Sequence, residues 1–182
     1  MTEVSRKIKE EPIEGFVVTG VALNETEAKT TVRGVPDKPG VAGFIFSRLA
    51  ERNINVDMII QSSPQKGKNT ISFTVNEKDL PEVKKVMEKL KSELPVEEIS
   101  YDSDIAKVSI VGAGMQSHPG VAAKMFTCLG QAGINIDMIS TSEIKISCTV
   151  RREEGKKAVR VIHKAFELDK EEEEEEKIEK RL

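Results

Sequence analysis

Two loops of this sequence carry groups that could bind a small molecule with both a carboxylate and an ammonium group. Each loop, Asp-Lys-Pro-Gly at 37–40 and Ser-His-Pro-Gly at 117–120, precedes apolar residues at helical spacing. The first N–H groups of a helix lack partners within it, so these loop ends can donate hydrogen bonds to a carboxylate. Asp37 offers an anion to the ammonium group. Because Ser117 replaces it in the second loop, we expect that site to be weaker, empty or differently selective.

Simpler roles for these polar residues stay open at this point. In one alternative, Asp37 serves merely as the cap of the following helix, because aspartate is a favoured helix cap. In the same way, His118 could serve merely as a hydrogen-bonding residue within its loop instead of contacting a ligand. Asp57 and Asp137 alternate with apolar neighbours in two matching strand-like runs, so each could face solvent or a subunit interface.

Other kinds of site find little support in the sequence. The run Gly112-Ala113-Gly114 lacks the third glycine of a dinucleotide fingerprint and the Gly-Lys-Ser/Thr of a P-loop. His118 and His163 have no cysteine or carboxylate at metal-ligand spacing, and no Ser–His–Asp or Cys–His arrangement is recognisable. Cys128 and Cys148 lie among apolar neighbours and are expected to be buried thiols. We therefore expect no catalytic residue, no metal and no cofactor.

The composition is that of a soluble globular protein that binds neither nucleic acid nor membrane. The 182 residues are 38% hydrophobic, 32% charged and 4% aromatic. Eight acids and four bases at 169–182 account for the net charge of −3, so the remainder is nearly neutral, without a dense basic stripe. No apolar run approaches the roughly 20 residues that cross a bilayer, and the N-terminus lacks the apolar segment of a secretion signal. We expect a cytoplasmic protein with a solvated acidic tail.

An internal repeat shows that the elements around the two loops occur twice. Four pairs of segments match in the same order, while the loops between them differ in length. The pairs are 28–34 with 106–112, 39–42 with 119–122, 54–59 with 134–139, and 71–75 with 146–150. The chain therefore consists of two copies of one small module.

Each copy is predicted to run strand, helix, strand, strand, helix. β-Branched residues predict the strands, apolar residues at helical spacing predict the helices, and Asn53 or Gly133 stands where a left-handed residue ends the first helix. In copy one the expected strands cover 30–35, start at Ile54 and cover 69–75. In copy two they cover 107–111, start at Ile134 and cover 143–150.

The last strand differs between the copies. Copy one has a further strand at 98–101 that completes βαββαβ, whereas copy two runs directly into the acidic tail. A β-rich segment at 15–23 opens the chain, and we expect it to supply the missing strand. The predicted fold is α+β, with two ferredoxin-like βαββαβ domains, the first inserted in the second. The expected boundaries are 25–104 for domain 1, 15–24 plus 105–168 for domain 2, and 169–182 for the tail.

These motifs resemble those of ACT domains, in which such a module has a Pro-Gly helix entry and an Ile-Asn-(Val/Ile)-Asp-Met-Ile strand. The tandem also has Gly-Val-Ala at 20–22, Val-Gly-Ala-Gly-Met at 111–115 and Ile-Ser-Thr-Ser-Glu at 139–143. Over about 15–168 the chain therefore resembles the regulatory region of aspartate kinase. That resemblance implies allosteric feedback inhibition of lysine, threonine and methionine biosynthesis by an end-product amino acid.

The resemblance also implies that effectors bind between ACT domains of different chains, and hence a homodimer. One implied site combines Asp37, Gly40, Val41, Ala42 and Gln61 with Asn135 and Ile136 of another chain, and its counterpart combines His118, Gly120, Thr141, Ser142 and Glu143 with Asn55 and Val56. The short polar side chains around Asp37 favour L-threonine. L-Lysine, the second candidate, needs an additional anion, which only Glu143 could supply.

The catalytic domain of the family, an ATP:L-aspartate 4-phosphotransferase, has no room in a chain of this length. The resemblance therefore implies a regulatory subunit, or an equivalent fragment, that pairs with a separate catalytic aspartate kinase subunit. The alternative is a free-standing ACT sensor that regulates transcription or another metabolic enzyme. No helix-turn-helix accompanies the modules.

Overall fold

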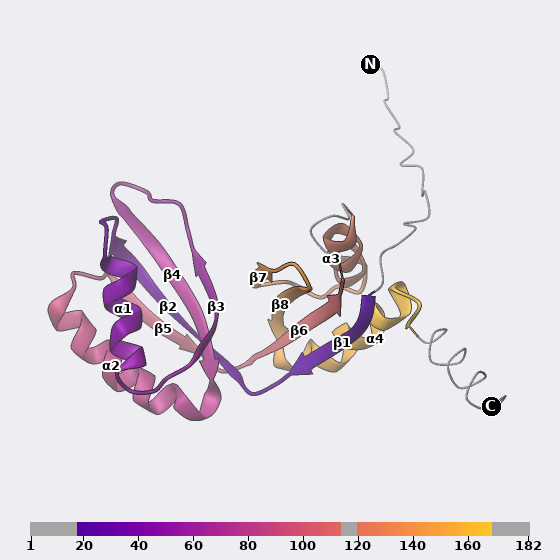
Figure 1. The fold of residues 1–182 in the computed structure, drawn as a ribbon, viewed down its shortest axis with the longest axis horizontal. Coiled ribbons are helices and arrows are strands. Elements are labelled where there is room, and N and C mark those ends of the chain that lie inside the picture. Colours follow the sequence, from indigo (N-terminus) through magenta and orange to yellow (C-terminus); the bar gives the residue numbers. More distant parts are fainter. Residues whose placement is uncertain (1–17, 114–119, 169–182) are drawn as a thin grey trace, which may run out of the picture.

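Two sheets of four antiparallel strands, each packed against two helices, make up the fold (Figure 1). The computed structural model describes residues 18–113 and 120–168. Module 1 contains β2 (Glu27–Pro36), α1 (Val41–Ala50), β3 (Val56–Gln61), β4 (Lys68–Asn76), the 3₁₀ turn η1 (Glu77–Asp79), α2 (Leu80–Glu93) and β5 (Glu98–Asp102). Module 2 contains β1 (Val18–Asn24), β6 (Ile105–Gly112), α3 (Val121–Gln131), β7 (Met138–Thr141), β8 (Lys145–Arg151), the 3₁₀ turn η3 (Arg152–Glu154) and α4 (Gly155–Ala165).

The N-terminal strand β1 belongs to module 2, as the sequence predicts. The strand orders are β3-β4-β2-β5 in module 1 and β1-β6-β8-β7 in module 2, and β1 pairs antiparallel with β6 from Val18 to Asn24. Figure 1 shows this indigo strand beside β6, in the other module from β2, which follows it in the sequence. With β1 as the last strand of module 2, the two orders are identical. The tandem ferredoxin-like fold with the first module inserted in the second is therefore confirmed, whereas the domain boundaries stay a prediction.

Two neighbouring turns carry the chain between the modules. Asn24 Oδ1 accepts a hydrogen bond from Thr26 N–H, and Asp102 Oδ1 accepts one from Asp104 N–H, both at 2.9 Å. Such bonds from a side chain to the backbone two residues on stabilise tight turns. Because both connections are short, the beginnings of β2 and β6 are held in contact at the boundary between the modules.

Apolar side chains between each sheet and its helices form two separate cores. In module 1, Phe73 of β4 is fully buried together with Ile45 and Leu49 of α1. In module 2, Met125 and Leu129 of α3 are fully buried against β6 and α4. Burial of each such side chain stabilises the fold by about 1.5–3 kcal/mol. The two copies of the repeat therefore fold around one core each.

The ends of the first helix in each module agree only partly with the sequence prediction. Asn53 and Gly133 have φ angles of 55° and 73°, so the predicted left-handed stops are confirmed. At the other end, α1 follows Gly40 at φ 89° and receives no side-chain cap. The alternative that Asp37 only caps this helix is therefore wrong, since the helix begins four residues later.

Two strands of module 2 start later than the sequence predicts. β7 begins at Met138 instead of Ile134, because the N–H of Ile134 donates to the carbonyl of Leu129 and closes the end of α3. β8 begins at Lys145, which leaves Glu143 in the turn between the two strands. In module 1 the strand expected from Ile54 begins at Val56. The residues between helix and strand are thus loops.

The two thiols differ in burial. Cys148 is 0% exposed, and burial raises the pKa of its thiol to about 12. Cys128 is only half-buried, and its thiol donates to the carbonyl of Met125 at 3.1 Å. Burial also raises the pKa of Cys128. Both cysteines are therefore mostly protonated near pH 7 and poor nucleophiles. Within the described ranges, no helix is long and apolar enough to cross a membrane.

Candidate functional site

Three polar residues, Asp37, Gln61 and Asn69, lie at the same end of the sheet of module 1. β2 and β3 finish there, at Pro36 and Gln61, and the antiparallel β4 starts there. The N–H of Asp37 donates to the carbonyl of Gly67 at 2.9 Å, which fixes the backbone just beyond β2. The Asp37 carboxylate is exposed and accepts a hydrogen bond from Asn69 Nδ2 at 3.5 Å. An accessible anion is thus held at this end of the sheet.

The start of α1 lies next to this anion. Gly40 and the following Ala42 are exposed, Val41 is half-buried, and no side chain caps the helix. A helix start without a side-chain cap keeps N–H donors and a partial positive charge available to an anion. Donors and a carboxylate therefore lie within a few residues of each other, as a zwitterionic ligand requires.

The matching end of module 2 is less polar. α3 also starts on an uncapped left-handed glycine, Gly120 at φ 109°. Thr141, Ser142 and Glu143 are exposed at the end of β7, and the N–H of Ser142 is already paired with the carbonyl of Lys145 at 2.7 Å. Among the predicted site residues, His118 lies outside the described residues. The second site therefore offers Glu143 as its acid in place of Asp37.

Asn69 is a site residue that sequence reasoning missed. It is 6% exposed, and its Oδ1 atom finds no hydrogen-bond partner among the described residues. At the matching position, module 2 has Ile144, which is 61% exposed. The repeat contained only the difference in residue type, Asn69 against Ile144, whereas the burial of Asn69 beside Asp37 became visible in the structure. Asn69 increases the polarity difference between the two sites.

The other predicted half-sites lie where the chain enters the second strands: Asn135 and Ile136 precede β7, whereas Val56 is already the first residue of β3 and pairs with Val75. Asn55 and Asn135 are exposed, and Val56 and Ile136 are half-buried. Neither Asn135 nor Ile136 takes part in any backbone hydrogen bond among the residues described. Their peptide groups are therefore available to a ligand.

One chain does not bring a complete site together. Asp37 follows the end of β2, whereas the Asn135–Ile136 loop lies near its beginning, because the adjacent Asp137 pairs with Lys29. A strand rises about 3.3 Å per residue, so Lys29 and Pro36 are roughly 23 Å apart. The same relation separates Gly120 from the Asn55–Val56 loop, since Asp57 pairs with Lys107 at the beginning of β6. The two predicted half-sites therefore lie apart within one chain.

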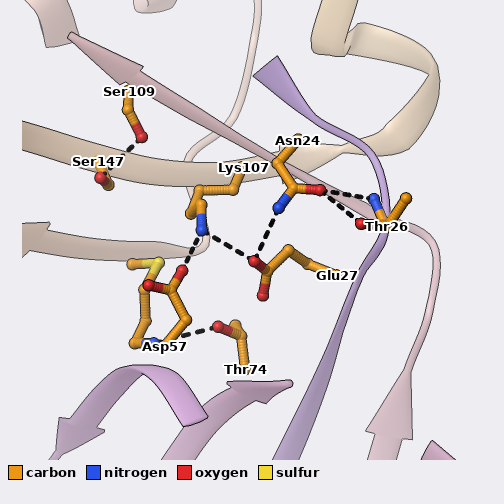
Figure 2. Close-up of polar contacts among 9 residues, drawn as sticks. Asn24, Thr26, Glu27, Asp57, Thr74, Lys107, Ser109 and Ser147 are labelled. Carbon is orange, nitrogen blue, oxygen red and sulfur yellow. Dashed lines mark hydrogen bonds and ion pairs between the residues drawn. The ribbon is translucent and has the colours of Figure 1, made fainter. Parts of the chain in front are cut away.

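A cluster of charged side chains, the inter-module ion cluster, joins the modules at this boundary. Lys107 of β6 pairs with Asp57, and Lys29 of β2 pairs with Asp137. Lys107 Nζ also lies 2.8 Å from Oε1 of Glu27, which accepts a further hydrogen bond from Asn24 at 3.0 Å. Figure 2 shows Lys107 between the carboxylates of Asp57 and Glu27. These pairs hold the two sheets side by side.

Lys107 and Glu27 are nearly buried, which decides the electrostatics of the cluster. The side chains of Lys107 and Glu27 are 11% and 6% exposed. Burial by itself lowers the pKa of Lys107, but the hydrogen bonds and charges of Asp57 and Glu27 outweigh it, so the pKa is raised. One oxygen of Glu27, Oε2, is buried without a partner among the described residues. The positive charge of Lys107 therefore offsets the free-energy cost of burying the Glu27 carboxylate.

Asp57 and Asp137 thus have a role that neither sequence alternative named. Each pairs with a lysine of the other module, while 36% and 45% of their side chains stay exposed. The repeat contained a signal for this, because Lys29 matches Lys107 and Asp57 matches Asp137. The pairing itself became visible only with the modules in place.

Comparison with known proteins assigns the two copies of the repeat to the same domain family. One ACT domain model matches residues 30–94 and another matches 108–166. The chain is 46% identical over 169 residues to an aspartokinase of Mycolicibacterium smegmatis, of which it covers 40%. The regulatory subunit of aspartate kinase from Thermus thermophilus is 44% identical, with a TM-score of 0.78, and the match covers 82% of this chain and 98% of that one.

A chain in a solved structure of aspartokinase alpha and beta subunits is similar to the same degree. It is 47% identical with a TM-score of 0.78, and the match covers 84% of this chain and all of that one. The chain spans about 40% of the length of the curated aspartokinases it matches. The similarity is therefore to the regulatory part of these proteins.

Proposed function

Because the chain belongs to the aspartate kinase family, as a regulatory region of two ACT domains, we propose that it binds an end-product amino acid and conveys feedback inhibition to a catalytic subunit. The observation that carries this proposal is the exposed Asp37 carboxylate beside the uncapped start of α1. The carboxylate would pair with the ammonium group of the effector, and the helix start would receive its carboxylate. Gln61 lies at the same end of the sheet and would contact the side chain.

L-Threonine is the proposed effector at the Asp37 site, with L-lysine as the second candidate. Gln61, Ser62 and Asn69 at this end of the sheet carry uncharged polar side chains, Asp37 adds an exposed carboxylate, and the nearby Lys68 is paired with Glu97 at 2.8 Å. The hydroxyl of Ser62 is already engaged, since it accepts a hydrogen bond from the N–H of Thr70 at 2.9 Å. Gln61 and the partner chain's Asn135–Ile136 loop are therefore left to recognise the threonine hydroxyl. L-Lysine would fit better near Glu143, which offers a second acid.

A homodimer is part of the proposal, because the half-sites of one chain lie at opposite ends of its strands. β3 and β7 are edge strands, and they expose Ile59 and Ile139 at matching positions of the repeat, at 52% and 40%. Exposed edges that carry large apolar residues are normally covered by another chain. We expect light scattering at micromolar concentration to give the mass of two chains. A strictly monomeric mass, with and without L-threonine and L-lysine, would contradict a site shared between subunits.

The proposed partner is a catalytic aspartate kinase subunit, and a cytoplasmic location follows from its use of ATP. One similar solved structure contains the alpha and beta subunits of aspartokinase, and the match covers all of one of its chains. The purified chain alone should phosphorylate no aspartate. Added to a catalytic subunit from the same cell, it should form a stable complex and make aspartate phosphorylation sensitive to L-threonine or L-lysine. An unchanged rate with both amino acids would contradict the regulatory role, and binding of amino acids without any complex would favour a free-standing sensor.

A further inference from the structure

The two lysine–aspartate pairs of the inter-module ion cluster are reciprocal. Lys29 of module 1 pairs with Asp137 of module 2, and Lys107 of module 2 pairs with Asp57 of module 1. In the internal repeat, Lys29 aligns with Lys107 and Asp57 aligns with Asp137, so the two pairs occupy equivalent positions. Lys107 of β6 is thus connected to the start of β3, and Lys29 of β2 is connected to the loop just before β7.

The loops in question are the ones that the proposed effector site uses. Asp137 directly follows the Asn135–Ile136 loop. The backbone is fixed on either side of that loop, because the N–H of Ile134 donates to the carbonyl of Leu129 at 3.0 Å and that of Asp137 to the carbonyl of Thr149 at 2.9 Å. The loop itself has no backbone hydrogen bond among the described residues. The Asp137 side chain is thus a direct contact between this loop and module 1, in addition to the approach of β7 to β3.

We propose that Asp137 and Asp57 are positioning residues of the effector sites. Each one anchors a ligand-binding loop to a lysine of the opposite module, so that the loop is presented in the position that a second chain requires. This inference rests on the proposed function of the loops. It adds residues that would not touch the effector but would determine how tightly it binds.

The two anchors are unequal. Lys107 is also held by Glu27, whereas module 2 has the apolar Ile105 at the position that matches Glu27, so Lys29 has one acid partner in the cluster. The Lys29 and Asp137 side chains are 18% and 45% exposed. A partly exposed pair contributes little to stability, so it can be removed without unfolding the chain. The Asn135–Ile136 loop is accordingly the more adjustable of the two, and it completes the Asp37 site.

A double-mutant cycle on the weaker pair tests this inference with the full chain. The variants are Lys29→Met, Asp137→Asn and the combination of both, with Glu98→Gln as control. Glu98 forms an exposed pair with Arg33 inside module 1, at 3.3 Å, and lies outside the proposed site. Calorimetric titration with L-threonine and with L-lysine gives the affinity. Hydrogen exchange over 135–138, without ligand, reports how firmly the loop is held through the amides of Asp137 and Met138, which donate to Thr149.

Either single change should weaken L-threonine binding by up to about fivefold, because a partly exposed ion pair contributes at most about 1 kcal/mol. Either change should also speed exchange at 135–138 at least threefold. The double variant should be no worse than the singles, because both remove the same contact. Glu98→Gln should change neither quantity. Additive effects, or exchange at 135–138 that stays as in the wild type, would overturn the inference.

The two arms of the experiment separate this inference from the proposed function. If the wild type binds neither amino acid, the proposed function fails, and the exchange measurement still decides whether Lys29 and Asp137 order the loop. If the wild type binds L-threonine and Lys29→Met binds it equally well, the positioning role fails and the proposed function stands. An effect of Lys29→Met on exchange at 135–138 is specific, because the two positions lie in different modules.

Discussion

Replacing Lys107 by methionine should lower the free energy of unfolding by about 3–5 kcal/mol, because it leaves the charge of Glu27 buried without a cation. The Glu27 side chain is 6% exposed, and one of its oxygens already has no partner among the described residues. A buried carboxylate of this kind is stabilised mainly by its counter-ion. The loss should appear in urea unfolding followed by circular dichroism.

Two matched variants show whether the buried charge is the cause. Combining Lys107→Met with Glu27→Gln should recover most of the loss, because glutamine is neutral and can still accept the hydrogen bond from Asn24. Lys29→Met, at the matching position of the repeat, should cost less than about 1 kcal/mol, because the Asp137 it leaves unpaired is 45% exposed. Equal destabilisation by the two lysine variants would contradict this explanation.

The pH dependence of the same variant has a defined sign. Since the folded-state pKa of Lys107 is raised, its contribution is fully present below the unfolded lysine value of about 10.4 and is lost as pH rises through the folded value. The difference in stability between the wild type and Lys107→Met should therefore be constant near pH 8 and shrink above about pH 10.5.

Replacing Asp37 by alanine should weaken L-threonine binding by about 10- to 100-fold, since a charge-assisted hydrogen bond contributes about 1.5–3 kcal/mol. Asp37 is exposed, so its removal should leave the melting temperature of the ligand-free chain nearly unchanged. The matched control is Glu143→Gln in the other site, which should weaken L-lysine binding and leave L-threonine binding intact. Calorimetry on the three proteins gives the comparison. Equal L-threonine affinity of the wild type and Asp37→Ala would contradict the role of Asp37 as ammonium anchor.

The topology of the chain could be predicted because the repeat constrains it. Module 2 was one strand short by comparison with module 1, and a β-rich segment before the first copy had no other partner, which assigned β1 to β6. The helix stops at Asn53 and Gly133 followed from local conformational preference. The helix stops depend on short-range sequence patterns, and the strand assignment depends on a comparison of the two copies. The sequence contains both kinds of information.

The parts that could not be predicted depend on contacts across the fold. Apolar and polar residues alternate from Ile134 into β7, which is typical of a strand, so the pattern did not reveal that the N–H of Ile134 closes the end of α3 and that the strand begins only at Met138. The pairing of Asp137 with Lys29 depends on how two modules meet, and alternating residues on one strand do not contain that information. Asn69 was missed because its burial beside Asp37 results from the packing of β4 against β2.

Titration of the unmodified, purified chain with single amino acids is the most direct test of amino-acid sensing. Calorimetry should show saturable binding of L-threonine, or of L-lysine, and no comparable heat with L-methionine. At a hundredfold excess over the dissociation constant the ligand should stabilise the folded protein by about 2.7 kcal/mol, which a rise in melting temperature would report. Absence of both heat and thermal shift with all three amino acids would contradict the proposal that this chain is the effector-binding part of an aspartate kinase.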